Sequence, residues 1–521
     1  MWGPPPFIDP LDGFNTNAMA MIMQVVEGLF TIDVKSNNSA IIPHLAKNYE
    51  WSADGLNLTC QIRKNIKFHD GTPFNATAVK WNFDRIYRLI DWMMYGYLWL
   101  LPDGTPIINE TQVIDDYTVK FVLNTPYVPL ISLLASYSAY IVSPSSTPAD
   151  EFIDPDTDNL VGTGPFIYDG PPVFHNINES QDCNFTLSVN PRYWGAKPKI
   201  DKIVFHGIED FTDRIEAMYS GKVDILCREI LANQTAIEMF RENSSFTVTD
   251  GLLPYIAWIV MNNKLINTTM RMAISYASNY SSFIDYFNRY DERIIRAKSS
   301  LPESILYYNT TGIDIPYYNL TLARQTLINV GWPGTEGLTA NDNISAGNEW
   351  AIIALTTPLA TYNYTSWCLS SYSIGVILTE NLKQIGVKIE MENISYFEFV
   401  AMVYEKAGYH RNMFGFLYNY WVADYNDASN FIDLFFTNKM IAENAGQVND
   451  TLIQKWMEDA LIETNPTARA RLYYQIQKRL IEEIYPHIWL YTITYTTIQV
   501  SNLKGWYPNW YRIEFKHVEF T

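Results

Sequence analysis

Signals for β-strands and signals for α-helices alternate along the chain, and this alternation is the feature that most constrains its fold. Residues 56–63 alternate apolar and polar side chains directly after Asp54-Gly55, which predicts the second arm of a β-hairpin. Asn75 then precedes residues 76–86, where apolar positions recur at helical spacing, so we expect an amphipathic helix with Asn75 as its N-cap. A strand-like alternation and a helical spacing so close in sequence indicate mixed α and β structure.

The same alternation continues towards the C-terminus. Residues 117–123 alternate after the turn at Asp115-Asp116, which predicts a second hairpin. Residues 214–220 predict a helix that ends at Gly221, and a long amphipathic helix is expected from an N-cap at Thr467 to a stop before Pro486. Since no internal repeat or low-complexity linker interrupts this pattern, the chain is predicted to be α/β with more than one sheet.

Size and charge limit the classes of protein to consider. The chain has 521 residues, of which 48% are hydrophobic, enough to bury several cores. At about 150 residues per domain this length predicts three or four domain-sized units. Its 56 acidic and 37 basic residues give a net charge of −19, which disfavours binding to nucleic acid or to anionic lipid. No run of 18 apolar residues occurs, so no segment is expected to cross a membrane.

The sequence lacks the patterns that mark an active site, a metal site or a cofactor site. No G-x-x-x-x-G-K-[ST] or G-x-S-x-G occurs, and the seven histidines never pair at metal-ligand spacing. Residues 162–165 superficially resemble a nucleotide loop, but Pro165 removes a backbone donor and no helix is expected after it. We therefore expect no cofactor, no metal and no catalytic residue, with a hydrolase built from distant residues as the alternative.

The four cysteines are too few for a disulfide-held fold and too scattered for a zinc site, being Cys60, Cys183, Cys227 and Cys368. We expect buried thiols, and one disulfide between two of the four stays open as the alternative.

Acceptor sites for N-glycosylation are unusually frequent. With 42 Asn and 68 Ser plus Thr, chance placement would give about five N-x-[ST] sequons, whereas the chain has 16. This excess favours a chain that passes an N-glycosylation machinery on its way out of the cell. The sequons lie at Asn37, Asn57, Asn75, Asn109, Asn178, Asn184, Asn233, Asn243, Asn267, Asn279, Asn309, Asn319, Asn343, Asn363, Asn393 and Asn449.

Several sequence blocks occur in the order that is typical of one receptor family. The chain resembles the extracellular solute-binding proteins of the oligopeptide, dipeptide and nickel ABC importers, family 5. The blocks are Asp9-Pro10, residues 26–30 (VEGLF), 42–46 (IPHLA), 51–55 (WSADG), 62–74 (IRKNIKFHDGTPF), 162–166 (GTGPF), 190–195 (NPRYWG), 220–225 (SGKVDI), 381–387 (NLKQIGV) and 421–425 (WVADY). One departure is Asp427-Ala428-Ser429, which stands where the family usually has a proline after the last block.

The resemblance implies an α/β, two-lobed periplasmic-binding-protein-like (type II) fold with an extra hairpin-rich subdomain on lobe I. We expect lobe I to comprise residues 1–31, 166–257 and 488–521, with the extra subdomain at 32–165. Lobe II is expected at 258–487. A ligand in the cleft between the lobes would favour the closed form by its differential affinity.

The resemblance also implies which residues bind the ligand. In lobe I these are residues near the blocks at 9–30 and 220–225, and in lobe II they are residues of the 421–425 block and of an aromatic segment that also holds Tyr362 and Tyr364. The expected ligand-binding residues are Phe14, Asn15, Thr16, Arg228, Glu229, Trp367, Trp421, Asp424 and Tyr425.

The implied function is that of a substrate-binding receptor that captures an oligopeptide and delivers it to the permease subunits of an ABC importer. Asp424 would accept from the peptide's α-ammonium group. A di- or oligosaccharide of the cello-oligosaccharide type is the alternative ligand, since Trp421 and many tyrosines offer flat apolar faces. We expect a monomer that binds no nucleic acid and lies outside the cytoplasm at the cell surface, in an archaeal setting. The opening Met1-Trp2-Gly3 lacks the features of a signal peptide, which suggests that one was trimmed.

Overall fold

The computed structural model describes most of the chain, and the structural statements below refer to that part. The described residues are 8–12, 16–36, 39–93, 95–101, 103–171, 173–177, 180–208, 210–229, 234–288, 293–332, 335, 337–342, 351–356, 371–393, 415–436 and 444–521.

The chain divides into two compact units, which we describe separately. Unit 1 comprises Met1–Gly251, Asp424–Asn426 and Thr496–Thr521, and unit 2 comprises Leu252–Ala423 and Asp427–Tyr495. The boundaries expected from the sequence lay at residues 257/258 and 487/488, and the division of lobe I into a core and an extra subdomain stays a prediction.

A four-stranded antiparallel sheet with one covering helix forms part of unit 1, in the strand order β3–β4–β6–β5. The elements are β3 (Ala46–Trp51), β4 (Asn57–Ile62), β5 (Ile108–Asp115), β6 (Thr118–Leu123) and α2 (Ala76–Leu89). Both hairpins and the helix confirm the sequence prediction, and the side chain of Asn75 accepts from the backbone N–H of Ala78 at 2.9 Å. Val79, Phe83 and Ile86 of α2 are buried against the sheet because they recur at helical spacing.

A second core of unit 1 joins elements from both ends of the chain. It contains α1 (Thr16–Val25), a sheet of β10 (Lys202–Gly207), β9 (Ser180–Val189) and β7 (Phe166–Tyr168), with β8 (Val173–Ile177) beside β9. Trp506 and Phe515, close to the C-terminus, are buried in the same cluster. Phe205 of β10 lies with its ring centroid 5.9 Å from that of Phe515.

The remaining elements of unit 1 are short. They are β1 (Phe30–Ile32), β2 (Ile41–Pro43), η1 (Gly96–Trp99), α3 (Leu130–Leu133), η2 (Tyr137–Ala139), α4 (Phe211–Tyr219), β11 (Ile225–Glu229), α5 (Gln234–Glu242), β12 (Phe246–Leu252), β19 (Leu503–Lys504) and β20 (Glu519–Phe520). Helix α4 ends before Gly221, which has φ +71°, as its sequence predicts.

A mixed sheet forms the centre of unit 2. Its strands lie in the order β18–β13–β17–β15–β16, and β14 pairs with β18. All seven residues of β13 are buried, which fits its central position and its continuous apolar sequence. The strands are β13 (Tyr255–Met261), β14 (Ile294–Arg296), β15 (Ala351–Thr356), β16 (Lys388–Asn393), β17 (Phe416–Val422) and β18 (His487–Val500), whose last residues belong to unit 1.

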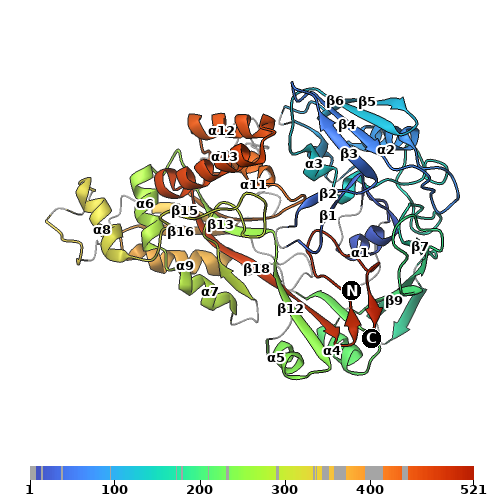
Figure 1. Ribbon diagram of the computed structural model, residues 1–521. Helices are drawn as coiled ribbons and strands as arrows, with labels where there is room; N and C mark the ends of the chain where they lie inside the picture. The colour runs from blue at the N-terminus through green and yellow to red at the C-terminus, as the bar shows by residue number, and fades with distance from the viewer. Residues whose placement is uncertain are drawn as a thin grey trace. The chain divides into compact units, whose positions relative to one another are not determined.

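Helices cover both faces of this sheet. Figure 1 draws α12 and α13 above it and α7 and α9 below it. The ring of Phe287 on α7 contacts Tyr491 of β18, and the ring of Phe436 on α11 contacts Trp489 of the same strand. The helices are α6 (Thr268–Ala277), α7 (Tyr280–Asn288), α8 (Leu320–Asn329), α9 (Ser371–Lys383), α11 (Ser429–Phe436), α12 (Thr451–Ile462), α13 (Pro466–Arg479) and the π-helical turn η4 (Leu480–Ile484).

Two details of the sequence prediction can be compared with these elements. Thr467 was expected to cap α13, but the N-cap is Asn465, whose side chain accepts from the backbone N–H groups of Thr467 and Ala468. Cys60 and Cys227 are free thiols, and Cys183 and Cys368 lie outside the described side chains. Among the described residues, no helix combines the length and the apolar character that a membrane crossing requires.

Candidate functional site

The parallel strands of unit 2 end at one edge of its sheet. β15 runs parallel to both β16 and β17, so the carboxyl ends of all three strands point the same way. In open α/β sheets ligands bind beyond the carboxyl ends of such strands. This edge, where β17 ends at Val422, is therefore the candidate site of unit 2.

Trp421 lies next to the end of β17 and is half-buried. Its indole Nε1 donates to Oδ1 of Asn430 on α11 at 3.1 Å, and Asn430 is buried. This bond fixes the ring plane at the candidate edge. A fixed, partly exposed indole can stack on a flat ligand surface.

Asp424 lies three residues after Trp421 and belongs to unit 1. Its carboxylate is buried, and the hydroxyl of Tyr97 on η1 donates to Oδ2 at 3.2 Å. Burial and the charge of Asp424 both raise the pKa of Tyr97 well above its usual value, so this phenol stays protonated and remains a donor. Burial and the charge of Asp424 also raise the pKa of Tyr137.

Tyr425 and Asn426 anchor the same short segment in unit 1. Tyr425 is buried in the core beneath β3–β4–β6–β5, with its hydroxyl 3.4 Å from that of Tyr127. Asn426 Nδ2 donates to the backbone carbonyl of Ser39 at 2.9 Å, and Ser39 has φ +51°. Residues 424–426 are thus held by contacts on both sides of Asp424.

Asp427 returns the chain to unit 2 through a buried ion pair. The guanidinium of Arg469 on α13 donates to both carboxylate oxygens of Asp427, at 2.5 and 2.8 Å, and both side chains are 2% exposed. Arg469 also lies over the rings of Tyr307 and Tyr473. Asp427 accepts from the backbone N–H of Ser429 at 2.9 Å and so also marks the start of α11.

The other residues expected to bind the ligand have no described side chain. Phe14, Asn15 and Trp367 lie outside the described residues, as do Tyr362 and Tyr364. Thr16 begins α1, and Arg228 and Glu229 end β11. For these residues ligand binding stays a prediction.

Glu27 gathers four of the sequence blocks into one buried cluster. Its carboxylate accepts from His44 Nε2 at 2.8 Å, Thr163 Oγ1 at 2.7 Å, Tyr193 OH at 2.7 Å and Trp194 Nε1 at 2.8 Å. Burial acts to raise the pKa of Glu27, but the charge of His44 and the hydrogen bonds from His44, Trp194 and Tyr193 lower it to about 2. We call these five residues the Glu27 cluster, and its saturated hydrogen bonding indicates a structural role.

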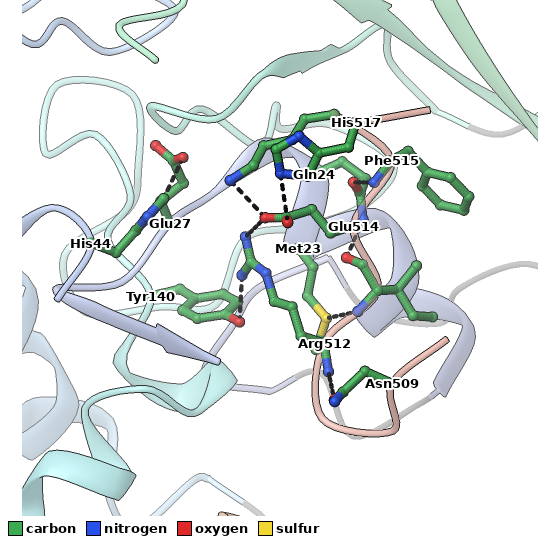
Figure 2. A network of polar contacts seen from close by, with 12 residues as sticks. Met23, Gln24, Glu27, His44, Tyr140, Asn509, Arg512, Glu514, Phe515 and His517 are labelled. Atoms are coloured by element: carbon green, nitrogen blue, oxygen red, sulfur yellow. Dashed lines mark hydrogen bonds and ion pairs between the residues drawn. The ribbon is translucent and has the colours of Figure 1, made fainter. Parts of the chain in front are cut away.

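The C-terminal segment packs beside the Glu27 cluster, as Figure 2 shows. Arg512 donates to the hydroxyl of Tyr140 at 2.7 Å and lies 3.8 Å from Glu514, which also pairs with Lys516. Gln24 of α1 donates to the carbonyl of Ile513 at 2.8 Å. These contacts bind residues 509–518 to α1 and complete unit 1.

Among the described residues no group of three His, Cys, Asp or Glu side chains could hold a metal ion. The arrangement around Asp424 instead presents a buried carboxylate with a neutral phenol donor, close in sequence to a fixed indole. Such groups can bind an ammonium group and a flat side chain. Tyr97 was missed by sequence reasoning, because it lies in the aromatic run Tyr95–Trp99 with no distinguishing pattern around it.

Known proteins resemble this chain over most of its length. The model of the "Bacterial extracellular solute-binding proteins, family 5 Middle" matches residues 40–442. The glutathione-binding protein GsiB of Pectobacterium atrosepticum is 24% identical over 510 residues, which are 96% of this chain and 89% of that protein. The probable D,D-dipeptide-binding periplasmic protein DdpA of Escherichia coli is 22% identical over 515 residues, 97% of this chain and 90% of that protein.

Solved structures share the fold. HbpA2 from Haemophilus parasuis superposes with a TM-score of 0.82 at 20% identity, covering 100% of this chain and 98% of that one. DppA from Helicobacter pylori, in complex with the peptide STSA, gives 0.66 at 20% identity and covers 100% and 96%. AgaA from A. tumefaciens R10, in complex with agropinic acid, gives 0.66 at 18% identity and covers 100% and 97%. The chain therefore has the type II periplasmic-binding-protein fold.

Proposed function

Since the chain belongs to the bacterial extracellular solute-binding proteins of family 5, we propose that its ligand is a short peptide whose α-ammonium group binds Asp424. The chain is a substrate-binding receptor of an ABC importer and acts outside the cytoplasm. The observation that carries the peptide proposal is the buried Asp424 carboxylate with Tyr97 donating to it.

The chemistry of Asp424 suits an ammonium group. A carboxylate can accept several hydrogen bonds at once, and the bond from Tyr97 is one that Asp424 accepts. A charge-assisted hydrogen bond from an ammonium group to a buried carboxylate contributes about 1.5–3 kcal/mol. The names of GsiB and DdpA, which bind glutathione and D,D-dipeptides, support a peptide, as does the peptide bound to DppA.

An oligosaccharide is the second candidate ligand. It is favoured by the half-buried indole of Trp421, held in one orientation by Asn430, because an apolar ring face stacks on a pyranose. AgaA, in complex with agropinic acid, supports the view that this fold accommodates ligands other than the peptides above.

Isothermal calorimetry on two variants separates the candidates. For a peptide ligand, Asp424→Asn weakens binding by tenfold or more, because it removes the charge that pairs with the α-ammonium group. N-acetylation of the peptide has the same effect on the unchanged protein. Asp91→Asn, which removes an exposed charge between α2 and η1, serves as the matched control and leaves the affinity unchanged.

For an oligosaccharide, Trp421→Ala is the more damaging change. Micromolar binding of a cello- or malto-oligosaccharide, with no binding from a pool of peptides, would overturn the peptide proposal.

Further parts of the proposal concern the setting of the receptor. We propose that it is a monomer attached at the cell surface, that it delivers its ligand to a membrane permease without chemical turnover, and that it is a glycoprotein of archaeal type. The acidic surface and the excess of sequons support these statements.

A further inference from the structure

Sequon asparagines differ from the other asparagines in their exposure. Among the described residues none of the ten sequon asparagines with a described side chain is buried; they are Asn57, Asn75, Asn109, Asn184, Asn243, Asn267, Asn279, Asn309, Asn319 and Asn449. The eight buried asparagines of the same part of the chain all lie outside sequons; they are Asn82, Asn190, Asn262, Asn381, Asn426, Asn430, Asn444 and Asn509.

Burial separates the two sets only in part, because eleven described asparagines outside sequons are also not buried. Chance sequons would fall on buried and exposed asparagines alike, because the pattern N-x-[ST] carries no information about burial. A glycan is a bulky hydrophilic group that must leave the surface, so it restricts its asparagine to exposed positions. The threefold excess is the observation that favours modification, and the absence of burial leaves each of the ten sites open to it.

Some sequons have another structural origin. Asn75, Asn267 and Asn319 are N-caps, whose Oδ1 accepts from a backbone N–H of the first helical turn. An N-cap position favours asparagine whether or not a glycan is attached, so these three sequons are weaker evidence for glycosylation. Asn109 and Asn309 are exposed and cap no helix.

Asn109 lies on the edge strand β5, which among the described strands pairs only with β6. The register shifts between Ile108 and Glu110, so Asn109 is the extra residue of a β-bulge without a partner in the ladder. An exposed edge with a bulge is accessible to an enzyme and leaves room for a sugar.

Asn309 lies in the segment of unit 2 that joins β14 to α8. Its Oδ1 accepts from the backbone N–H of Thr311 at 2.9 Å, an Asx-turn across its own sequon. Within the described part of the chain no hydrogen bond involves its Nδ2, the atom to which a sugar is attached.

We propose that Asn109 and Asn309 carry N-linked glycans, one on each unit. The amide Nδ2 attacks the anomeric carbon of a sugar carried on a lipid phosphate. The N–C bond forms while the C–O bond to phosphate breaks, the lipid phosphate leaves with the electron pair, and Nδ2 releases one proton. This inference rests on the extracytoplasmic location of the receptor and not on its ligand.

Mass spectrometry of the full chain, purified from the cells that naturally make it, tests the proposal. Peptides that contain Asn109 and Asn309 are expected to carry a mass increment that trifluoromethanesulfonic acid shortens to the sugar bound directly to Nδ2. Expressed in the same cells, Asn109→Gln and Thr311→Ala each lower the intact mass by one glycan. Thr311→Ser keeps the sequon and the glycan.

The control is Asn124→Gln, an exposed asparagine outside any sequon, which leaves the mass of the glycans unchanged. Unmodified peptides at both sites, or a glycan that persists in Thr311→Ala, would overturn the proposal. Since peptide binding is measured on the same preparations, an unglycosylated protein that still binds peptide contradicts this inference and the glycoprotein proposal, but not the proposed ligand.

Discussion

Glu27 shows how much a single residue can organise in unit 1. Four side chains between residues 44 and 194 donate to its carboxylate, so four of the blocks on which the family resemblance rests meet at one side chain. The blocks at 26–30, 42–46, 162–166 and 190–195 thus mark a structural cluster rather than a ligand site. Sequence reasoning recognised the blocks but not their common partner, because their contacts are distant along the chain.

Glu27→Gln is expected to lower the stability of unit 1 by about 2–4 kcal/mol, since an amide presents an N–H group to a site that offers only donors. The folded pKa of about 2 lies below the ordinary value of 4.5, so the stabilisation from Glu27 is full above pH 4.5 and is lost as the pH falls towards 2.

Thermal denaturation between pH 7 and pH 2 checks both statements about Glu27. The variant should melt at lower temperature at pH 7 and show a weaker acid dependence than the unchanged protein. Glu216→Gln, on the exposed face of α4, is the control. Equal melting temperatures for both variants at pH 7 would show that the Glu27 cluster contributes little.

At the scale of elements, local patterns predicted more than distant ones. The hairpins β3–β4 and β5–β6 and the helix α2 follow from period and turn chemistry within a few residues. The prediction that Thr467 caps α13 was wrong. Asn465 is a stronger N-cap than Thr467, and Pro466 after it suits the first helical position. Tyr97 was missed, since its link to Asp424 spans 327 residues.

The cap of α13 gives a direct comparison of two neighbouring residues. Asn465→Ala should lower the free energy of unfolding by about 1 kcal/mol, because the backbone N–H groups of Thr467 and Ala468 lose their acceptor. Thr467→Ala should change the stability by less than about half of that amount. Chemical denaturation of the two variants shows which residue caps the helix. A larger loss of unfolding free energy for Thr467→Ala would support the sequence prediction of Thr467 as the cap.

The ion pair of Asp427 and Arg469 joins the start of α11 to α13. Arg469→Met is expected to lower the free energy of unfolding by about 3–5 kcal/mol, because it leaves the buried Asp427 carboxylate without its arginine partner. The double variant Arg469→Met with Asp427→Leu should regain much of the lost unfolding free energy, because no buried charge of this pair remains. It should stay about 1 kcal/mol short, because the backbone N–H of Ser429 loses its acceptor on Asp427. A double variant no more stable than Arg469→Met would mean that packing against Tyr307 and Tyr473, not charge, governs the effect.

At the scale of the whole molecule, a receptor should gain stability when its ligand binds, and it should not alter the ligand chemically. A ligand that binds only the folded protein adds about 2.7 kcal/mol at a concentration a hundredfold above Kd. Thermal shift against panels of peptides, sugars and metal ions should find the class that stabilises the chain. Reproducible hydrolysis of a panel member, abolished by Asp424→Asn, would contradict the assignment as a receptor.

The contact between Gln24 and Ile513, 489 residues apart, has a consequence for the time course of biosynthesis. Helix α1 emerges long before its packing partners at 506–518, so unit 1 cannot close its second core until residues 506–518 have been made. Unit 2 draws its residues from 252–495 and has all of them earlier. A chain that leaves the cytoplasm while it is still growing would therefore complete unit 1 only after residues 506–518 have followed.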